Sequence, residues 1–149
     1  MKPLLMYWLP VFAWMALIFS ASTDMGASRG TSRIIGPILH WLKPDLSEET
    51  TDRIVFAIRK TAHVTEYGIL ALLFWRAIRK PAKGETRPWR WPEAGWAWAL
   101  AALYAATDEV HQSFVPSRSG TIKDVLLDSA GAGLGLLLCW LFGRWRKYW

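Results

Sequence analysis

Residues 122–142 read IKDVLLDSAGAGLGLLLCWLF, and this stretch decides the fold class. It carries Asp124 and Asp128 near its start and then no charge through Phe142. A helix that rises 1.5 Å per residue over this length covers roughly 30 Å, which is the thickness of the hydrocarbon core of a bilayer. The stretch therefore predicts a membrane-spanning helix with its acidic residues at one end.

Three earlier segments are also apolar enough to suit a membrane. Residues 3–21 carry no charge and are interrupted only by Pro10, residues 54–78 are uncharged from Tyr67 to Trp75, and residues 96–115 stay apolar until Asp108. A cleavable signal peptide is the alternative for the first segment, but the run is long for one and contains two tryptophans. We therefore expect four membrane-spanning helices, at about 3–21, 54–78, 96–115 and 122–142.

Composition supports this fold class. The chain has 149 residues, of which 52% are apolar and 20% are charged, so intrinsic disorder is excluded. Cys139 is the single cysteine, which excludes a disulfide scaffold. The net charge of +6 comes from bases that flank apolar runs rather than forming a stripe on a soluble surface, so we expect no nucleic-acid partner. The length favours one domain, residues 1–149.

Lysine and arginine are concentrated in segments that would face the cytoplasm under the positive-inside rule. These are Lys2, residues 76–93 between the second and third spans, and residues 144–147 after the fourth. Because four spans place both termini and the central connection on one side, we expect an all-α, integral membrane four-helix bundle with an N-in, C-in topology. Tryptophans that favour the interface fall on the same side: Trp89, Trp91, Trp96, Trp140, Trp145 and Trp149.

The first outer loop, residues 22–53, is too long for a plain turn. Apolar residues within 34–42 repeat on one helical face, which predicts a short helix lying on the outer membrane surface. Gly36 and Pro37 oppose this helix, and Pro44 would end it. Asp45 or Ser47 would then begin the helix of the second span.

Polar residues from the last three spans converge at one membrane level. In this topology the second and fourth spans enter from outside and the third leaves towards it, so their polar ends meet near the outer face. Pairs such as His63 with Glu66 share a helical face. Along the fourth span, the acidic stripe continues through Gly131 and Gly135, a small-xxx-small pattern that lets another helix approach closely.

We therefore expect an outward-facing intramembrane polar pocket. A charge at mid-bilayer costs about 2.5–3.5 kcal/mol on insertion scales, so these groups must pair within the bundle. The candidate proton-transfer residues are His63, Glu66, Asp108, Glu109 and His111. The candidate substrate-binding residues are Arg59, Lys60, Gln112, Arg118, Asp124 and Asp128.

Three motifs in order resemble the VanZ-like family. Residues 59–67, RKTAHVTEY, are similar to its RKxxHxxEY segment, and residues 108–118, DEVHQSFVPSR, to its DExHQxFxPxR segment. Residues 124–131, DVLLDSAG, are similar to its DxxxNxxG segment, with Asp128 where many members carry Asn. Residues 19–22, FSAS, resemble the serine-rich end of the family's first helix.

The resemblance implies a small multi-pass protein of the bacterial plasma membrane, linked to the cell envelope and to susceptibility to teicoplanin, a glycopeptide. It supplies no established reaction. An enzymatic role stays open, in which a carboxylate acts as general base while Arg59 and Arg118 bind the phosphate of a lipid-linked substrate such as an isoprenoid phosphate.

Two other interpretations of the pocket remain open. In one, the site binds a headgroup or an antibiotic or relays protons, and a homo-oligomer is an option. In the other, the charges only pair and fix helix register. The pairs expected in that case are Arg59 or Lys60 with Asp124 or Asp128, and Arg118 with Asp108 or Glu109.

Cofactor use is open on the same residues. His63-x-x-Glu66 and Asp108-x-x-His111 resemble carboxylate–histidine pairs of metal-binding helix bundles. Arg59 and Lys60 would oppose a cation, so a divalent metal is an alternative and no metal ligand is assigned.

Overall fold

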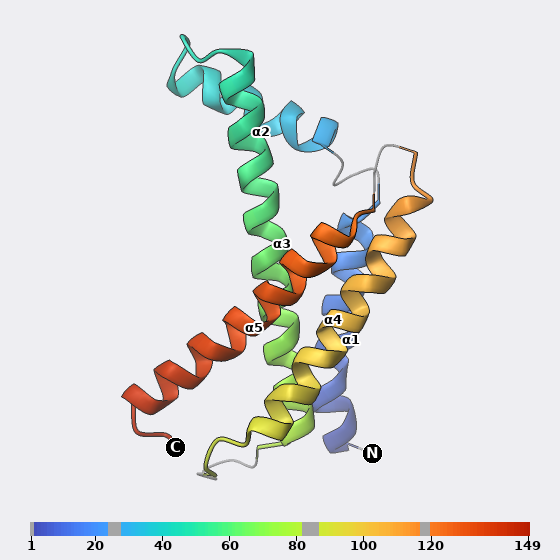
Figure 1. Ribbon diagram of the computed structural model, residues 1–149, viewed down its shortest axis with the longest axis vertical. Helices are drawn as coiled ribbons and strands as arrows, with labels where there is room; N and C mark the ends of the chain where they lie inside the picture. The colour runs from blue at the N-terminus through green and yellow to red at the C-terminus, as the bar shows by residue number, and fades with distance from the viewer. Residues whose placement is uncertain (1, 24–27, 82–86, 117–119) are drawn as a thin grey trace.

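The computed structural model describes residues 2–23, 28–81, 87–116 and 120–149 (Figure 1). All regular secondary structure in these ranges is helical, which confirms the all-α expectation. The helices are α1 (Lys2–Ala21), α2 (Ser28–Leu42), α3 (Glu48–Arg79), α4 (Trp91–Ser113) and α5 (Ile122–Trp145).

Local capping explains where α3 and α5 begin. Ser47 is the N-cap of α3, since its hydroxyl accepts a hydrogen bond from the backbone N–H of Thr50 at 3.3 Å. Ser47 is one of the two helix starts expected from the sequence, and the helix begins well before the span expected at residues 54–78. Thr121 caps α5 in the same way, accepting from the backbone N–H of Asp124 at 3.2 Å.

The helix expected in the first loop is present and longer than expected. It runs from Ser28 and passes through Gly36 and Pro37 without a break, ending at Leu42. Figure 1 shows α2 across the N-terminal part of α3, beyond the other helices. Its position on a membrane surface stays a prediction.

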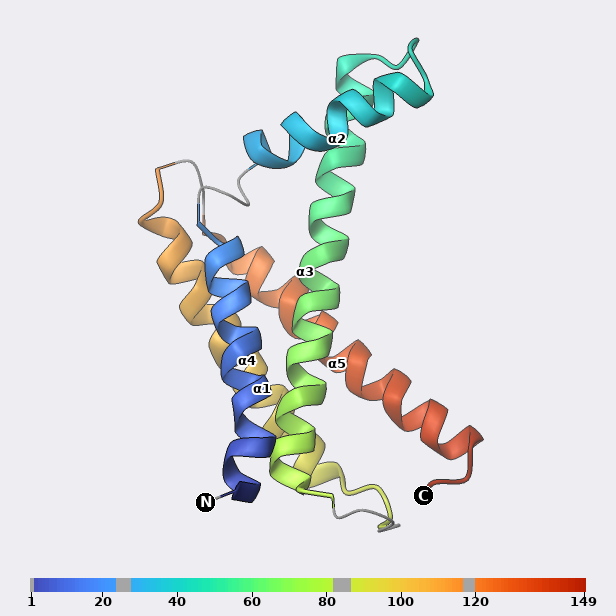
Figure 2. The ribbon, with the colours of Figure 1, turned by 180° about the vertical axis from the view of Figure 1, so that it is seen from behind.

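The helices run so that the chain ends gather at one end of the molecule. Figures 1 and 2 show the start of α1, the end of α3, the start of α4 and the C-terminus at this end, while the end of α1, the end of α4 and the start of α5 lie further towards α2, which with the start of α3 forms the other end. In both views α5 crosses α3 obliquely. The helix ends that carry described bases, at the end of α3 and the end of α5, therefore lie towards this end, and the membrane topology stays a prediction.

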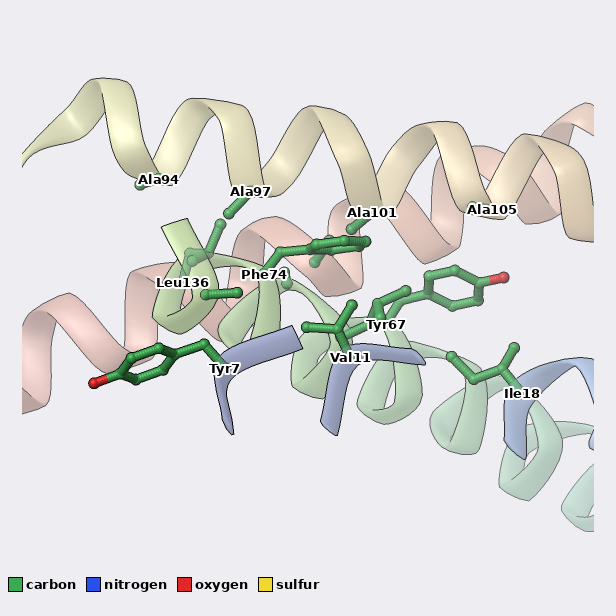
Figure 3. Packing of buried hydrophobic residues seen from close by; sticks show 14 residues of the cluster. Tyr7, Val11, Ile18, Tyr67, Phe74, Ala94, Ala97, Ala101, Ala105 and Leu136 are labelled. Atoms are coloured by element: carbon green, nitrogen blue, oxygen red, sulfur yellow. The ribbon is translucent and has the colours of Figure 1, made fainter. Parts of the chain in front are cut away.

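The core joins apolar side chains of α1 and α3 to a stripe of small residues on α4 (Figure 3). Val11 and Ile18 of α1 and Tyr67 of α3 are almost completely buried. The Tyr104 hydroxyl of α4 also donates to the backbone carbonyl of Met15 at 2.7 Å. The stripe on α4 consists of Ala94, Ala97, Ala101 and Ala105.

Glycines allow α5 to contact α3 backbone to backbone. A Cβ added at Gly131 would lie 2.6 Å from the Val64 carbonyl oxygen, and one at Gly135 would lie 2.8 Å from the Gly68 Cα. The small-xxx-small stripe predicted on the fourth span therefore serves a contact within the chain, between these two helices.

The helix surfaces that face away from the core carry many large apolar side chains. Among the described helices, α5 is long and apolar enough by length and composition to cross a membrane, and Leu5–Ala21 is a shorter apolar helix. Large exposed apolar side chains also occur on α1, α4 and α5, for example Phe12, Leu103 and Leu138. Membrane character thus has support, while the four-span arrangement stays a prediction.

Candidate functional site

Polar residues of α3, α4 and α5 and of the end of α1 meet near the end of α4 and the start of α5. Four of the predicted site residues are buried although each is polar or charged, with exposures of 5% or less. Buried carboxylates are unusual unless paired or functional. The four are Asp108, Glu109, Gln112 and Asp128.

Asp108 is the hydrogen-bond acceptor that joins α1, α3 and α4. Its Oδ2 accepts from the hydroxyl of Ser22 at 2.7 Å, from the amide of Gln112 at 2.8 Å and from the hydroxyl of Tyr67 at 3.3 Å. Gln112 also donates to the Ser22 oxygen at 3.4 Å. Neutral donors therefore hold this carboxylate, and in the described part of the chain no base pairs with it.

Glu109 ties α4 to the beginning of α5. The backbone N–H of Thr121, the N-cap residue of α5, donates to Glu109 Oε2 at 2.9 Å. The neighbouring Gly120 passes close to α4, since a Cβ there would lie 2.2 Å from the Glu109 carbonyl oxygen. The close approach of Gly120 and Thr121 to α4 therefore fixes the position of this carboxylate.

α3 and α5 contribute a histidine–carboxylate contact and an ion pair. His63 Nδ1 lies 3.5 Å from Asp128 Oδ1, and Asp128 is completely buried. One turn outward, the Lys60 ammonium donates to Asp124 Oδ1 in a half-buried ion pair. Lys60–Asp124 is one of the alternative pairs expected from the sequence, and partial exposure limits its contribution to stability.

The motifs that build this geometry lie within one family match. The model of the VanZ/LLP1 family matches residues 7–143. The chain belongs to the VanZ/LLP1 family. No curated protein and no solved structure matches the chain.

The carboxylates of this VanZ/LLP1 protein act on one another electrostatically. Asp108, Asp124 and Asp128 all lie close enough to Glu109 for their charges to interact with it. Three side chains also leave acceptor atoms buried without a hydrogen bond among the described residues. These atoms are Asp108 Oδ1, Glu109 Oε1 and both carboxylate oxygens of Asp128.

The remaining candidates lie around the edge of the cluster. The ring of His111 packs on Phe19, with centroids 4.2 Å apart, and its Nδ1 is buried without a hydrogen bond in the described ranges. The backbone carbonyl of Glu66 accepts from the indole of Trp14 at 3.0 Å. Arg59 is partly exposed and forms no ion pair with any described residue. Arg118 lies outside the described residues.

Three residues of the VanZ/LLP1 site were not among the sequence candidates: Ser22, Tyr67 and Thr121. Tyr67 closes the RKxxHxxEY segment and Ser22 closes the serine-rich end of the first helix, so the motifs held a signal for both. Thr121 precedes α5 as a typical N-cap residue, and capping was the available signal.

The part of the chain that the structure describes contains no set of side chains arranged as metal ligands. There, no group of three or more His, Cys, Asp and Glu side chains is arranged to hold an ion. His63 contacts Asp128 on α5 and His111 packs on Phe19, so the two carboxylate–histidine pairs do not converge there. No step is assigned to a metal.

Proposed function

We propose that this protein is a multi-pass protein of the bacterial plasma membrane whose outward-facing polar site binds or acts on a phosphorylated, lipid-linked component of the cell envelope. The observation that carries the proposal is that carboxylates are buried inside the molecule while large apolar side chains are exposed on its surface. Asp128 is 0% exposed whereas Leu103 on the outside is 63% exposed. In water the exposed apolar surface would be unfavourable, whereas in a bilayer it contacts lipid, and charges inside the bundle cost less than charges exposed to hydrocarbon.

The unsatisfied carboxylate oxygens favour a functional site over a purely structural network. A network that only fixes helix register is expected to satisfy its buried acceptors, because each one left open costs about 1–3 kcal/mol. Asp128 Oδ2 and Glu109 Oε1 have no hydrogen-bond partner among the described residues. They are free to accept hydrogen bonds from hydroxyl groups of a substrate or from water.

The arrangement supports proton transfer next to an anion-binding edge. Glu109 or Asp128 would accept a proton from a substrate hydroxyl, with His63 beside Asp128 to receive or return it. Arg59, which has no carboxylate partner in the described ranges, and Arg118 would bind the phosphate. This proposal extends to an effect on glycopeptide susceptibility, as the VanZ-like resemblance implies.

We expect His63→Gln and Glu109→Gln to abolish a teicoplanin phenotype conferred by the protein while its amount in the membrane stays unchanged. Both substitutions keep side-chain volume and remove the ability to accept a proton. Susceptibility of cells with and without each variant is the measurement, with immunoblots of membrane fractions for amount. Glu49→Gln, an exposed glutamate of the first turn of α3, is the matched control.

Mass spectrometry of lipids that copurify with the protein identifies the bound substrate class. Retention of an isoprenoid phosphate supports the proposal. If both variants keep the phenotype at normal abundance, the polar site is not the active feature. If both lose abundance in proportion to the phenotype, the structural interpretation is correct.

Topology is tested by single cysteines placed in a Cys139→Ala background. In intact cells an impermeant maleimide is expected to label Lys43→Cys and Lys123→Cys and to leave Lys80→Cys unlabelled. All three positions are exposed, and the end of α2 and the start of α5 lie away from the end of the molecule at which α3 finishes. Permeabilised cells provide the control for reactivity. Labelling of Lys80→Cys alone in intact cells would reverse the proposed orientation.

A further inference from the structure

An apolar groove runs between α3 and α5 on the outside of the bundle. It has a volume of about 450 Å³ and lies along the glycine contact. Its lining residues run from Val64 to Leu72 on α3 and from Gly131 to Phe142 on α5. Its floor is formed by Gly68, Gly131 and Gly135, and its walls by Leu72, Leu138 and Cys139. Small residues therefore bring the two backbones together and leave a hollow beside the crossing.

Among its described lining residues, the groove offers an occupant only two hydrogen-bonding side chains, Thr65 and the weakly bonding thiol of Cys139. The Thr65 hydroxyl donates to the Thr61 carbonyl of its own helix at 2.8 Å, so its proton is already used. An occupant would thus be held mainly by apolar contact along the groove.

The outer end of the groove is charged. Lys60 lies one turn before Val64 on α3, and Asp124 lies two turns before Gly131 on α5, so both continue the helical faces that form the groove. Lys60 and Asp124 pair with each other there. His63 and Asp128 lie directly behind this pair in the polar site. The groove is therefore charged at one end and apolar along its length, which is the pattern of an amphiphile.

We propose that the α3–α5 groove holds one hydrocarbon chain of a phosphate-bearing membrane lipid, with the phosphate at the charged end, where Lys60 and the preceding Arg59 supply positive charge. This inference rests on the proposed function, because it takes the groove to face the bilayer and the charged end to face outward. It adds the means by which a lipid substrate is aligned: the chain in the groove sets the depth at which the headgroup reaches Asp128 and Glu109.

The size of the groove favours a lipid chain over a transmembrane helix of a second copy. The lining from Gly131 to Phe142 extends for roughly 16 Å at 1.5 Å per residue. A helix of that length and about 10 Å across occupies more than about 1,000 Å³. The 450 Å³ available would leave most of such a helix outside, but it lies within the range of small-molecule pockets.

Photo-cross-linking tests the proposal on the full-length protein. The protein is reconstituted in phosphatidylethanolamine vesicles that contain a phosphatidylglycerol with a diazirine in one acyl chain, and the cross-linked residues are mapped by mass spectrometry. We expect cross-links at Leu138, Cys139 and Phe142 to exceed those at Leu103 several-fold, although Leu103 is also exposed.

Two tryptophan variants sharpen the test. Leu138→Trp fills the groove and is expected to lower cross-linking at Cys139 and Phe142 several-fold. Leu141→Trp is the matched control, because Leu141 is exposed on the same helix and is not part of the groove lining, and it should leave the cross-links unchanged.

Equal cross-linking at Leu103 and in the groove would overturn the proposal, since the lipid would then only surround the protein. Efficient bismaleimide cross-linking of Cys139 between two copies in the same vesicles would also overturn it, because a second copy would cover the groove. Glu109→Gln separates this inference from the proposed function. It should keep the lipid cross-links while losing the phenotype, so that each claim fails on its own measurement.

Discussion

Replacing Asp108 with alanine is expected to lower the free energy of unfolding by about 3 kcal/mol or more. One carboxylate oxygen accepts from donors on α1, α3 and α4, namely Ser22, Tyr67 and Gln112. All three donors are buried, at 4% exposure or less. Each buried donor left without an acceptor costs about 1–3 kcal/mol, so the losses accumulate at one point.

Unfolding of the purified protein in detergent, induced by SDS and followed by circular dichroism, measures this effect. Asp108→Asn keeps one acceptor oxygen in the same volume and should lose less than Asp108→Ala. Asp45→Ala, an exposed aspartate outside the helices, is the matched control and should change stability by less than about 0.5 kcal/mol. If Asp108→Ala resembled Asp45→Ala, the network would not hold the helices together.

Gly131→Ala is expected to separate α3 from α5 and to destabilise the fold by about 1–3 kcal/mol. The added methyl group would lie 2.6 Å from the carbonyl oxygen of Val64 and 2.8 Å from its Cα. Both atoms belong to the backbone, so no side chain can rotate away and the helices must move apart. The gain of up to about 1 kcal/mol from the higher helix propensity of alanine does not offset this cost.

Gly133→Ala on the same helix provides the comparison. Its added Cβ would contact only the edge of the Trp98 ring, at 3.7 Å, which is an ordinary van der Waals distance. We therefore expect this variant to be as stable as the parent or more stable. Equal destabilisation by the two alanines in SDS unfolding would show that the α3–α5 contact is looser than the structure has it.

Helix positions were largely predictable because hydropathy and caps act locally. The apolar run after Asp128 predicted α5, and the Ser47 cap was one of two starts proposed for α3. The end of α2 at Leu42, shortly before Pro44, was also predictable. Gly36 and Pro37 were misleading, since the helix continues through both residues. The penalty for a proline inside a helix is local and the rest of the α2 sequence outweighs it.

The partners of the site residues were less predictable. The sequence predicted that bases would pair with the acids, and Lys60 does pair with Asp124. Asp108 instead accepts from Ser22 and Tyr67, which are far from it along the chain. Which uncharged donor reaches a buried carboxylate depends on how the helices pack in space. No local sequence pattern encodes the distance between a donor and an acceptor on different helices.

By itself the sequence determined the all-helical class, the family and the polar residues that share helical faces, because hydropathy, capping and motif spacing are properties of adjacent residues. Only the tertiary structure decided that Ser22, Tyr67 and Thr121 complete the site, that Asp128 keeps two unsatisfied oxygens, and that α3 and α5 leave an apolar groove beside their glycine contact. These features arise from the crossing of helices distant in sequence, where close packing decides which atoms meet and which remain open.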